Sequence, residues 1–196
     1  MKFFPYIYEP DKSIEVYNET VKYFEDNPEI KKRIEELGWI YHTVGMIIPH
    51  NFENLWSGHY FPYIDSWEEL QVSFSQLCFG LYKQAFVSLR SGLELGMLSV
   101  YFNINDDGHN AVKDWLKSKE NTPRTDKIWK ILRQNTNINK FDEKHDLESV
   151  HKNLGYLHNY VHTKGAQHSN RMGFLKGNFQ TFEPKLISRW LKSYAD

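Results

Sequence analysis

Residues 81–104 read LYKQAFVSLRSGLELGMLSVYFNI, and this stretch decides the fold. On a helical wheel its large apolar side chains form two stripes, one containing Phe86 and Met97 and the other containing Leu98 and Phe102. A helix that is apolar nearly all round is buried rather than amphipathic. A third, narrow face carries only small residues: Ala85, Ser88, Gly92, Gly96 and Ser99. We therefore expect a buried central helix whose small face packs closely against another backbone, either inside a bundle or across a dimer.

Helical periodicity continues on both sides of this stretch. It predicts one long helix from Trp67 to about Ile104, which Gly80 would bend, and a second long helix at about 142–164 that ends at Gly165. Shorter helices are expected after the capping residue Ser13, at about 28–48, 110–119 and 125–135, and from Pro184 onward. No alternating strand pattern with hairpin turns occurs. The predicted fold class is all-α, a helical bundle around two long helices.

Composition favours one folded domain. The 196 residues can bury a sizeable core, and 40% apolar with 25% charged residues is typical of a globular protein. We expect a single domain, with an N-terminal helical extension at 1–65, a core at 66–165, and a basic loop and C-terminal helix at 166–196. The one cysteine, Cys78, excludes a disulfide framework and a cysteine-based zinc site, and suits a reducing cytoplasm. The sequence has no run of about 18 apolar residues that would predict a membrane span, and its apolar start is too short for a signal peptide.

Arg90 and Glu94 lie one helical turn apart, between the two apolar stripes of the central helix. As an exposed pair at the rim of the core they would contribute only a few tenths of a kcal/mol, on the order of 0.3. As a half-buried pair they would hold a site residue or a partner helix, and the loss of one partner of a buried pair costs about 3–5 kcal/mol. Both interpretations stay open from the sequence.

Three histidines, His151, His158 and His162, line the edge of the apolar stripe of the helix at 142–164. Histidines in such positions are often structural. His158 and His162 also have the i,i+4 spacing of two zinc ligands on a helix, but Asn159 stands where a zinc protease has its glutamate. We therefore predict no metal and no other cofactor, and keep a metal-dependent hydrolase using these two histidines as the weakest alternative.

Charge is unevenly distributed along the chain. The formal net charge of −1 argues against a dedicated duplex-DNA binder. Residues 149–182, however, contain no Asp or Glu, and four of the nine histidines lie among them. The cations of this acid-free segment are Lys152, Lys164, Arg171 and Lys176. Such a local surplus either attracts an anion such as phosphate or balances an acidic neighbour in the fold.

Residues 81–102 read LYKQAFVSLRSGLELGMLSVYF, and residues 154–165 read LGYLHNYVHTKG. Both strings resemble the HEPN-like helical bundles of prokaryotic defence and toxin systems. Between them, DWLKSKENTPRTDKIWKIL is similar to the tryptophan-bearing connector of such proteins. The resemblance covers about residues 67–165 and implies a HEPN-like bundle that often forms a homodimer.

The resemblance also implies a chemistry. Active HEPN ribonucleases carry an arginine a few residues before a histidine; the histidine activates the RNA 2′-hydroxyl, the arginine stabilises charge on the phosphate, and no metal is required. Only His162 matches this motif here, because the arginine positions are occupied by Gly155, Tyr156 and Leu157. Either His158 or Arg90 would have to replace the missing arginine.

These observations predict a degenerate HEPN-like module that binds a nucleic-acid or protein partner in a bacterial defence or toxin-type system. The alternative is a metal-independent endoribonuclease with His162 as general base, assisted by His158. An anionic partner such as RNA is expected to dock over residues 158–176 of a cytoplasmic homodimer, away from any membrane. The candidate binding residues are Arg90, Glu94, His151, Lys164 and Arg171.

Overall fold

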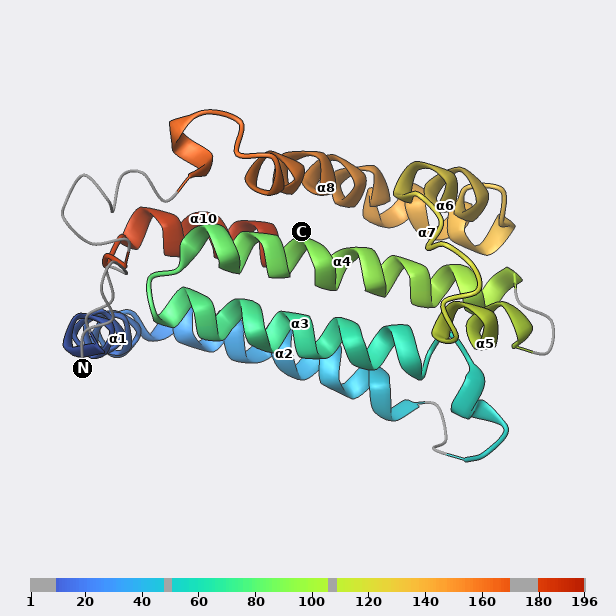
Figure 1. Ribbon diagram of the computed structural model, residues 1–196, viewed down its shortest axis with the longest axis horizontal. Helices are drawn as coiled ribbons and strands as arrows, with labels where there is room; N and C mark the ends of the chain where they lie inside the picture. Colours follow the sequence, from blue (N-terminus) through green and yellow to red (C-terminus); the bar gives the residue numbers. More distant parts are fainter. Residues whose placement is uncertain (1–9, 48–50, 106–108, 170–179, 196) are drawn as a thin grey trace. The chain divides into compact units, whose positions relative to one another are not determined.

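A computed structural model of the chain describes residues 10–47, 51–105, 109–169 and 180–195 (Figure 1). Every regular element within these ranges is a helix, so the predicted all-α class is confirmed. No described helix combines the length and the apolar character that crossing a bilayer would require.

The chain forms two compact units, each assembled from segments that are distant in sequence. Unit 1 comprises Met1–Trp39, Leu70–Leu89 and Tyr156–Asp196, and unit 2 comprises Ile40–Glu69 and Arg90–Gly155. Four helices therefore contribute to both units: α2 (Pro28–Ile47), α3 (Phe61–Cys78), α4 (Tyr82–Asn105) and α8 (Leu147–Val161). The three-part division of a single domain drawn from the sequence stays a prediction.

A break at Gly80 separates α3 from α4, where the sequence predicted one long bent helix. Gly80 has a φ of +68°, and a Cβ there would lie 2.6 Å from the carbonyl oxygen of Thr181. Only glycine combines this backbone conformation with so close an approach. The chain therefore reverses at residues 79–81, and α3 and α4 run antiparallel (Figure 1).

The small face of α4 packs against α3 in both units. In unit 1 the Ser73 hydroxyl donates to the Ala85 carbonyl oxygen at 2.6 Å, and in unit 2 the Ser66 hydroxyl donates to that of Gly92 at 2.6 Å. A Cβ at Gly96 would lie 3.0 Å from the hydroxyl of Tyr41. Of the two expectations for this face, packing inside the bundle is therefore the one that the structure shows.

The rest of unit 1 surrounds this helix pair with α1 (Pro10–Asp26) and α10 (Pro184–Ala195). The indole of the buried Trp190 donates to the Ser73 hydroxyl at 2.8 Å. Ser13 does not cap α1 as expected, because the helix already begins at Pro10 and the buried Ser13 hydroxyl donates to Gln180 at 2.7 Å. The predicted start of the last helix at Pro184 is confirmed.

Unit 2 has its own apolar core under α4. The helices that contribute to it are α5 (Asn110–Leu116), α6 (Thr125–Leu132), α7 (Thr136–His145) and the start of α8. Its buried residues are Met97, Leu98, Phe102, Val112, Ile128, Leu132 and Leu154. Between α2 and α3 the described residues contain a short 3-10 helix, η1 (Asn54–Trp56), and α3 begins at Phe61. The helix α2 (Pro28–Ile47) begins at the predicted proline.

The second predicted long helix, at 142–164, is also interrupted. Asp146 adopts a left-handed conformation with φ 47°, which ends α7, and α8 starts at the next residue. The backbone N–H of Leu147 donates to the Asp142 carboxylate at 2.7 Å and so caps the new helix. At its other end α8 stops at Val161, which leaves His162 in the following turn.

Candidate functional site

The four histidines of the acid-free segment have three different environments. His168, in the 3-10 helix η2 (Ala166–His168) of unit 1, is buried at 5% exposure. Its Nδ1 forms a hydrogen bond with the carbonyl oxygen of Lys164, and its ring meets Tyr160 edge-on at a centroid distance of 4.8 Å. His168 is therefore a structural residue of unit 1.

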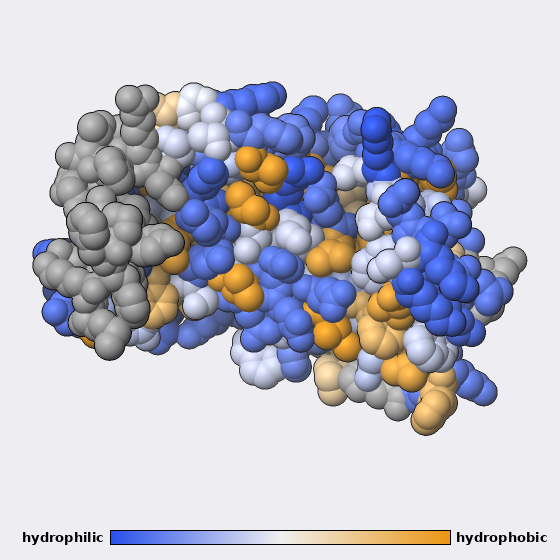
Figure 2. All heavy atoms as spheres, viewed as in Figure 1, coloured by the Kyte–Doolittle hydropathy of each residue, from blue (hydrophilic) through white to orange (hydrophobic). Residues whose placement is uncertain are grey.

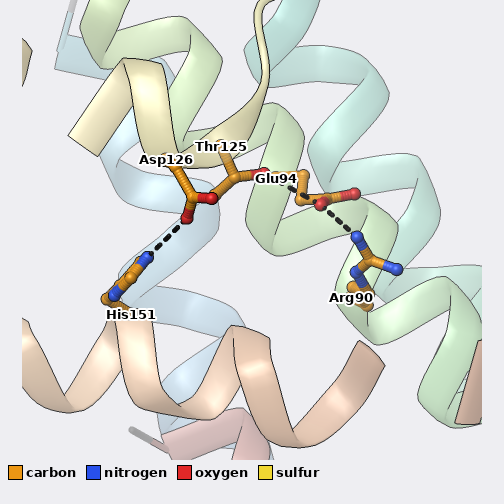
Figure 3. Close-up of polar contacts among 5 residues, drawn as sticks. All are labelled: Arg90, Glu94, Thr125, Asp126 and His151. Carbon is orange, nitrogen blue, oxygen red and sulfur yellow. Dashed lines mark hydrogen bonds and ion pairs between the residues drawn. The ribbon is translucent and has the colours of Figure 1, made fainter. Parts of the chain in front are cut away.

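His151, in unit 2, is tied to α6. Its Nε2 lies 3.2 Å from an Asp126 carboxylate oxygen (Figure 3). Its ring stacks on that of Trp129 at a centroid distance of 5.4 Å and an angle of 6°. The guanidinium of Arg133 lies over the Trp129 ring, 5.8 Å from its centroid, and also pairs with Asp142 at 3.1 Å. The imidazole thus joins α8 to α6.

The predicted pair Arg90–Glu94 is formed in unit 2, with 2.7 Å between Arg90 Nη2 and a Glu94 oxygen. The same oxygen accepts a hydrogen bond of 3.0 Å from the hydroxyl of Thr125, the first residue of α6 (Figure 3). The side chains are 19% and 35% exposed, so the pair is half-buried rather than on the surface. Because Glu94 accepts a hydrogen bond from the first residue of α6, the pair helps to attach α6 to α4.

These contacts form what we call the α6 network, which consists of Arg90, Glu94, Thr125, Asp126, Trp129 and His151. Arg90 and Glu94 form an ion pair, whereas the Asp126 carboxylate, 91% exposed, faces the His151 imidazole. Three of its members, Arg90, Glu94 and His151, were predicted from the sequence as binding residues, and the structure brings them together only through α6. Such an arrangement holds a helix in place and offers little uncompensated charge to a ligand.

His158 and His162 are arranged differently, in unit 1. Their rings lie 4.1 Å apart at an angle of 53°, and the backbone N–H of His162 donates to the His158 carbonyl oxygen at 3.2 Å. His158 is half-buried, whereas His162 is exposed. Two imidazoles therefore reach the surface side by side where α8 ends.

Two lysines lie near these imidazoles. The Lys83 ammonium of α4 donates to the Thr163 hydroxyl at 2.7 Å, next to His162 in the chain, and Thr163 is held in the left-handed conformation with φ 49°. Lys164 follows and is exposed. Within the described part of the chain, neither Lys83 nor Lys164 is paired with a carboxylate. We call Lys83, His158, His162, Thr163 and Lys164 the histidine end.

Buried aromatic packing holds the histidine end on unit 1. Tyr160, one turn before Lys164, stacks on Phe86 of α4 at a centroid distance of 4.1 Å. Its hydroxyl lies 3.0 Å from that of Tyr156 and accepts a hydrogen bond from Arg189 of α10. Burial raises the pKa of Tyr160 above its ordinary value, so the phenol stays protonated at neutral pH. The turn that carries His162 is thus anchored from α4 and α10.

The sequence identified only part of the histidine end. His158, His162 and Lys164 were predicted, but Lys83 was missed. The sequence of α4 contains no local signal that Lys83, near the start of this helix, contacts the turn that follows α8. The predicted binding residue Arg171 lies outside the described residues. Among the described residues, no group of three His, Cys, Asp or Glu side chains is placed to hold a metal ion.

Comparison of the chain with protein-family models, with curated proteins and with solved structures found no match. The likeness to HEPN-like bundles therefore rests on the two strings and the connector quoted above, and it stays a prediction. What the histidine end can do chemically follows from its side chains. Lysine ammonium groups and imidazolium rings donate hydrogen bonds to phosphate oxygens, and a neutral imidazole accepts a proton near pH 7.

Proposed function

We propose that this chain is a HEPN-like module that binds RNA through the histidine end, as part of a bacterial defence or toxin-type system. The observation that carries the proposal is the meeting of Lys83 with Thr163 beside His162 and Lys164, with no carboxylate paired to either lysine in the described ranges. The two histidines adjoin these lysines. By contrast, the one cation of the α6 network that carries a permanent charge, Arg90, is already paired with Glu94.

The phosphate backbone is the ligand that fits this arrangement best. Two ammonium groups and two imidazoles offer hydrogen-bond donors, and the imidazoles add positive charge when they are protonated. Binding of a flexible polyanion requires just such a group of donors, because each neutralised phosphate releases counterions and so favours association.

The experiment is fluorescence anisotropy of a labelled single-stranded RNA at several salt concentrations. The variant Lys83→Glu/Lys164→Glu should lower affinity and reduce the slope of log affinity against log salt by about 1.4, at roughly 0.7 per phosphate contact on a single strand. The matched control is Lys22→Glu/Lys32→Glu, with the same change in net charge on lysines that are 73% and 76% exposed. Equal losses in the two variants, or no binding by the wild type at low salt, would refute the proposal.

A second candidate, a metal-independent endoribonuclease, is favoured by the 4.1 Å packing of the two histidine rings. In that reaction neutral His162 takes the proton of the RNA 2′-hydroxyl, whose oxygen attacks the adjacent phosphorus. The P–O5′ bond breaks as protonated His158 gives a proton to the leaving 5′-oxygen, which leaves a 2′,3′-cyclic phosphate. With Gly155, Tyr156 and Leu157 at the arginine positions, Lys83 or Lys164 supplies the positive charge at the phosphate.

The two candidates are separated by RNA cleavage in the presence of a chelator. If the chain is an enzyme, the wild type releases 5′-hydroxyl fragments and His162→Ala does not, while RNA binding and helical content persist. His168→Ala is not a suitable control, because that histidine is buried; His145→Ala, in α7 of unit 2, is exposed and should cleave normally. Intact RNA after long incubation with the wild type leaves the binding module as the function.

A further inference from the structure

The C-terminal half of α2 carries apolar side chains on the side that faces away from the fold. Trp39, Ile40, Met46 and Ile47 are between 61 and 71% exposed, and Val44 is 41% exposed. At 100° per residue these positions and Thr43 fall on one continuous side of the helix. We call this side the α2 face. In Figure 2 apolar residues gather where Figure 1 shows the end of α2 and η1.

The opposite side of the same helix already has its packing partners in unit 2. Tyr41 stacks on Tyr63 at a centroid distance of 5.0 Å, and its hydroxyl lies 2.5 Å from that of Ser66. A Cβ at Gly45 would overlap the Tyr63 ring at 2.7 Å, so the backbone of α2 is pressed against α3. The helix is therefore apolar on both sides, although one side is sufficient to attach it to the fold.

We propose that the α2 face is the contact through which two copies of this chain pair, with the two α2 helices antiparallel. A two-fold axis at Thr43 places Trp39 of one copy opposite Ile47 of the other, and the reverse pair on the other side of the axis. The overlap is about 12 Å long, at 1.5 Å per residue. Thr43, the smallest side chain of the α2 face, then lies at the point of closest approach.

The size of the α2 face supports this pairing. Its five large side chains expose roughly 500 Å² of mostly apolar surface in each copy. That is at the upper end of what monomers usually expose in one patch, about 300–600 Å². A stable interface buries about 800 Å² on each partner, so the pairing requires a further ~300 Å² of each copy around the α2 face.

The charged residues of α2 favour an antiparallel pair over a parallel one, and they do not favour a membrane surface as the partner of the α2 face. Residues 37–47 contain no Asp, Glu, Lys or Arg, whereas the preceding turns carry Lys32, Arg33 and Glu36, with 3.7 Å between Lys32 and Glu36. A parallel pair would set Lys32 against Lys32, while an antiparallel pair leaves these turns in water. An interfacial membrane helix instead relies on an excess of Lys and Arg, whereas residues 29–36, EIKKRIEE, carry three cations and three anions.

The test is sedimentation of the full chain at about 50 µM, a concentration that detects micromolar pairing. The wild type should sediment with twice the 23.4 kDa of one chain, and Ile40→Glu/Ile47→Glu with a single mass and unchanged helical content. The matched control is Ile14→Glu on α1, which replaces another exposed isoleucine, 56% exposed, and should remain dimeric.

A cross-linking arm tests the antiparallel geometry without a charged substitution. With a short bis-maleimide reagent, Thr43→Cys should form covalent dimers and Lys32→Cys should not, because only position 43 lies near its own copy. A monomeric wild type overturns the proposal, and binding of that monomer to anionic vesicles would identify a membrane as the occupant. A dimer that survives both glutamates, or cross-links equally at positions 32 and 43, overturns it as well. The pairing does not depend on RNA binding, so either proposal can fail without the other.

Discussion

His151 and His158 lie two turns apart on the same side of α8, yet their surroundings have opposite electrostatics. His151 faces the carboxylate of Asp126 and the ring of Trp129, so its possible charge is matched and its position is fixed by packing. His158 adjoins a second imidazole, His162, beside the lysine contact to Thr163. The comparison teaches that a stripe of histidines is not one site, because the elements that cover a helix decide what each member does.

The largest expected difference concerns stability, and it should appear with Trp129→Ala. This change removes the aromatic surface that packs on His151 and under Arg133, so the free energy of unfolding should fall by about 3 kcal/mol. RNA affinity at the histidine end should stay within about twofold of the wild type, roughly 0.4 kcal/mol. Urea unfolding and RNA anisotropy on the same sample check both halves. Lost RNA binding by a folded Trp129→Ala protein would show that the two regions are not independent.

Alkaline pH should act on the histidine end through Tyr160. Its folded-state pKa lies above the unfolded value, so its contribution to stability is complete below about pH 10 and is lost as pH rises toward the folded pKa. The loss for one tyrosine is at most about 1.4 kcal/mol per pH unit. Burial also raises the pKa of Tyr63 to about 12, which adds a loss in unit 2. Unfolding measured from pH 9 to 12 should therefore be less steep in Tyr160→Phe, and an unchanged slope would contradict the assigned role of this phenol.

A smaller contrast is expected between the histidines themselves. His151→Ala removes an ion pair and an aromatic stack and should lower the free energy of unfolding by about 1 kcal/mol, whereas exposed His162 should change it by less than about 0.5 kcal/mol. Thermal melts at pH 7 measure both. Equal destabilisation by the two changes would mean that His162 also holds the fold, which would weaken its assignment to a binding surface.

The smallest effect lies inside the α6 network. Thr125→Val removes the donor and Glu94→Leu removes the acceptor of a 3.0 Å hydrogen bond, and a double-mutant cycle should give a coupling energy of about 0.5 kcal/mol. The corresponding cycle with Arg90→Met tests the 2.7 Å ion pair in the same way. Strictly additive effects in both cycles would reduce the network to separate surface contacts and leave α6 attached by apolar packing alone.

Much of this architecture could be predicted from sequence periodicity, but the breaks in the two predicted long helices could not. The all-α class, the start of α2 at Pro28 and the start of α10 at Pro184 were predictable because apolar spacing and prolines are local signals. The reversal at Gly80 depends on contact with Thr181, about one hundred positions away, and no local pattern records it. The break at Asp146 is hidden for a related reason, since a left-handed aspartate resembles any other polar residue in a helix.

The candidate site shows the same division between local and distant information. His158, His162 and Lys164 share one segment, so their neighbourhood could be predicted from spacing alone. Lys83 reaches the histidine end only because Phe86 and Tyr160 stack between α4 and α8, and that pairing of helices is a tertiary choice. The partner of His151, Asp126, likewise comes from another helix, α6. Without those positions, all three histidines of the stripe looked equivalent.

The most direct test of RNA binding at the histidine end observes the imidazoles themselves. Selective carbon-13 labelling of the nine histidines, with His151→Asn, His158→Asn and His162→Asn for assignment, resolves the two regions in one NMR spectrum. Titration with single-stranded RNA should shift the ring signals of His158 and His162 in proportion to saturation, and the shifts should disappear at high salt. The His151 signal should not move. A spectrum in which His151 shifts while His158 and His162 stay in place would contradict the account.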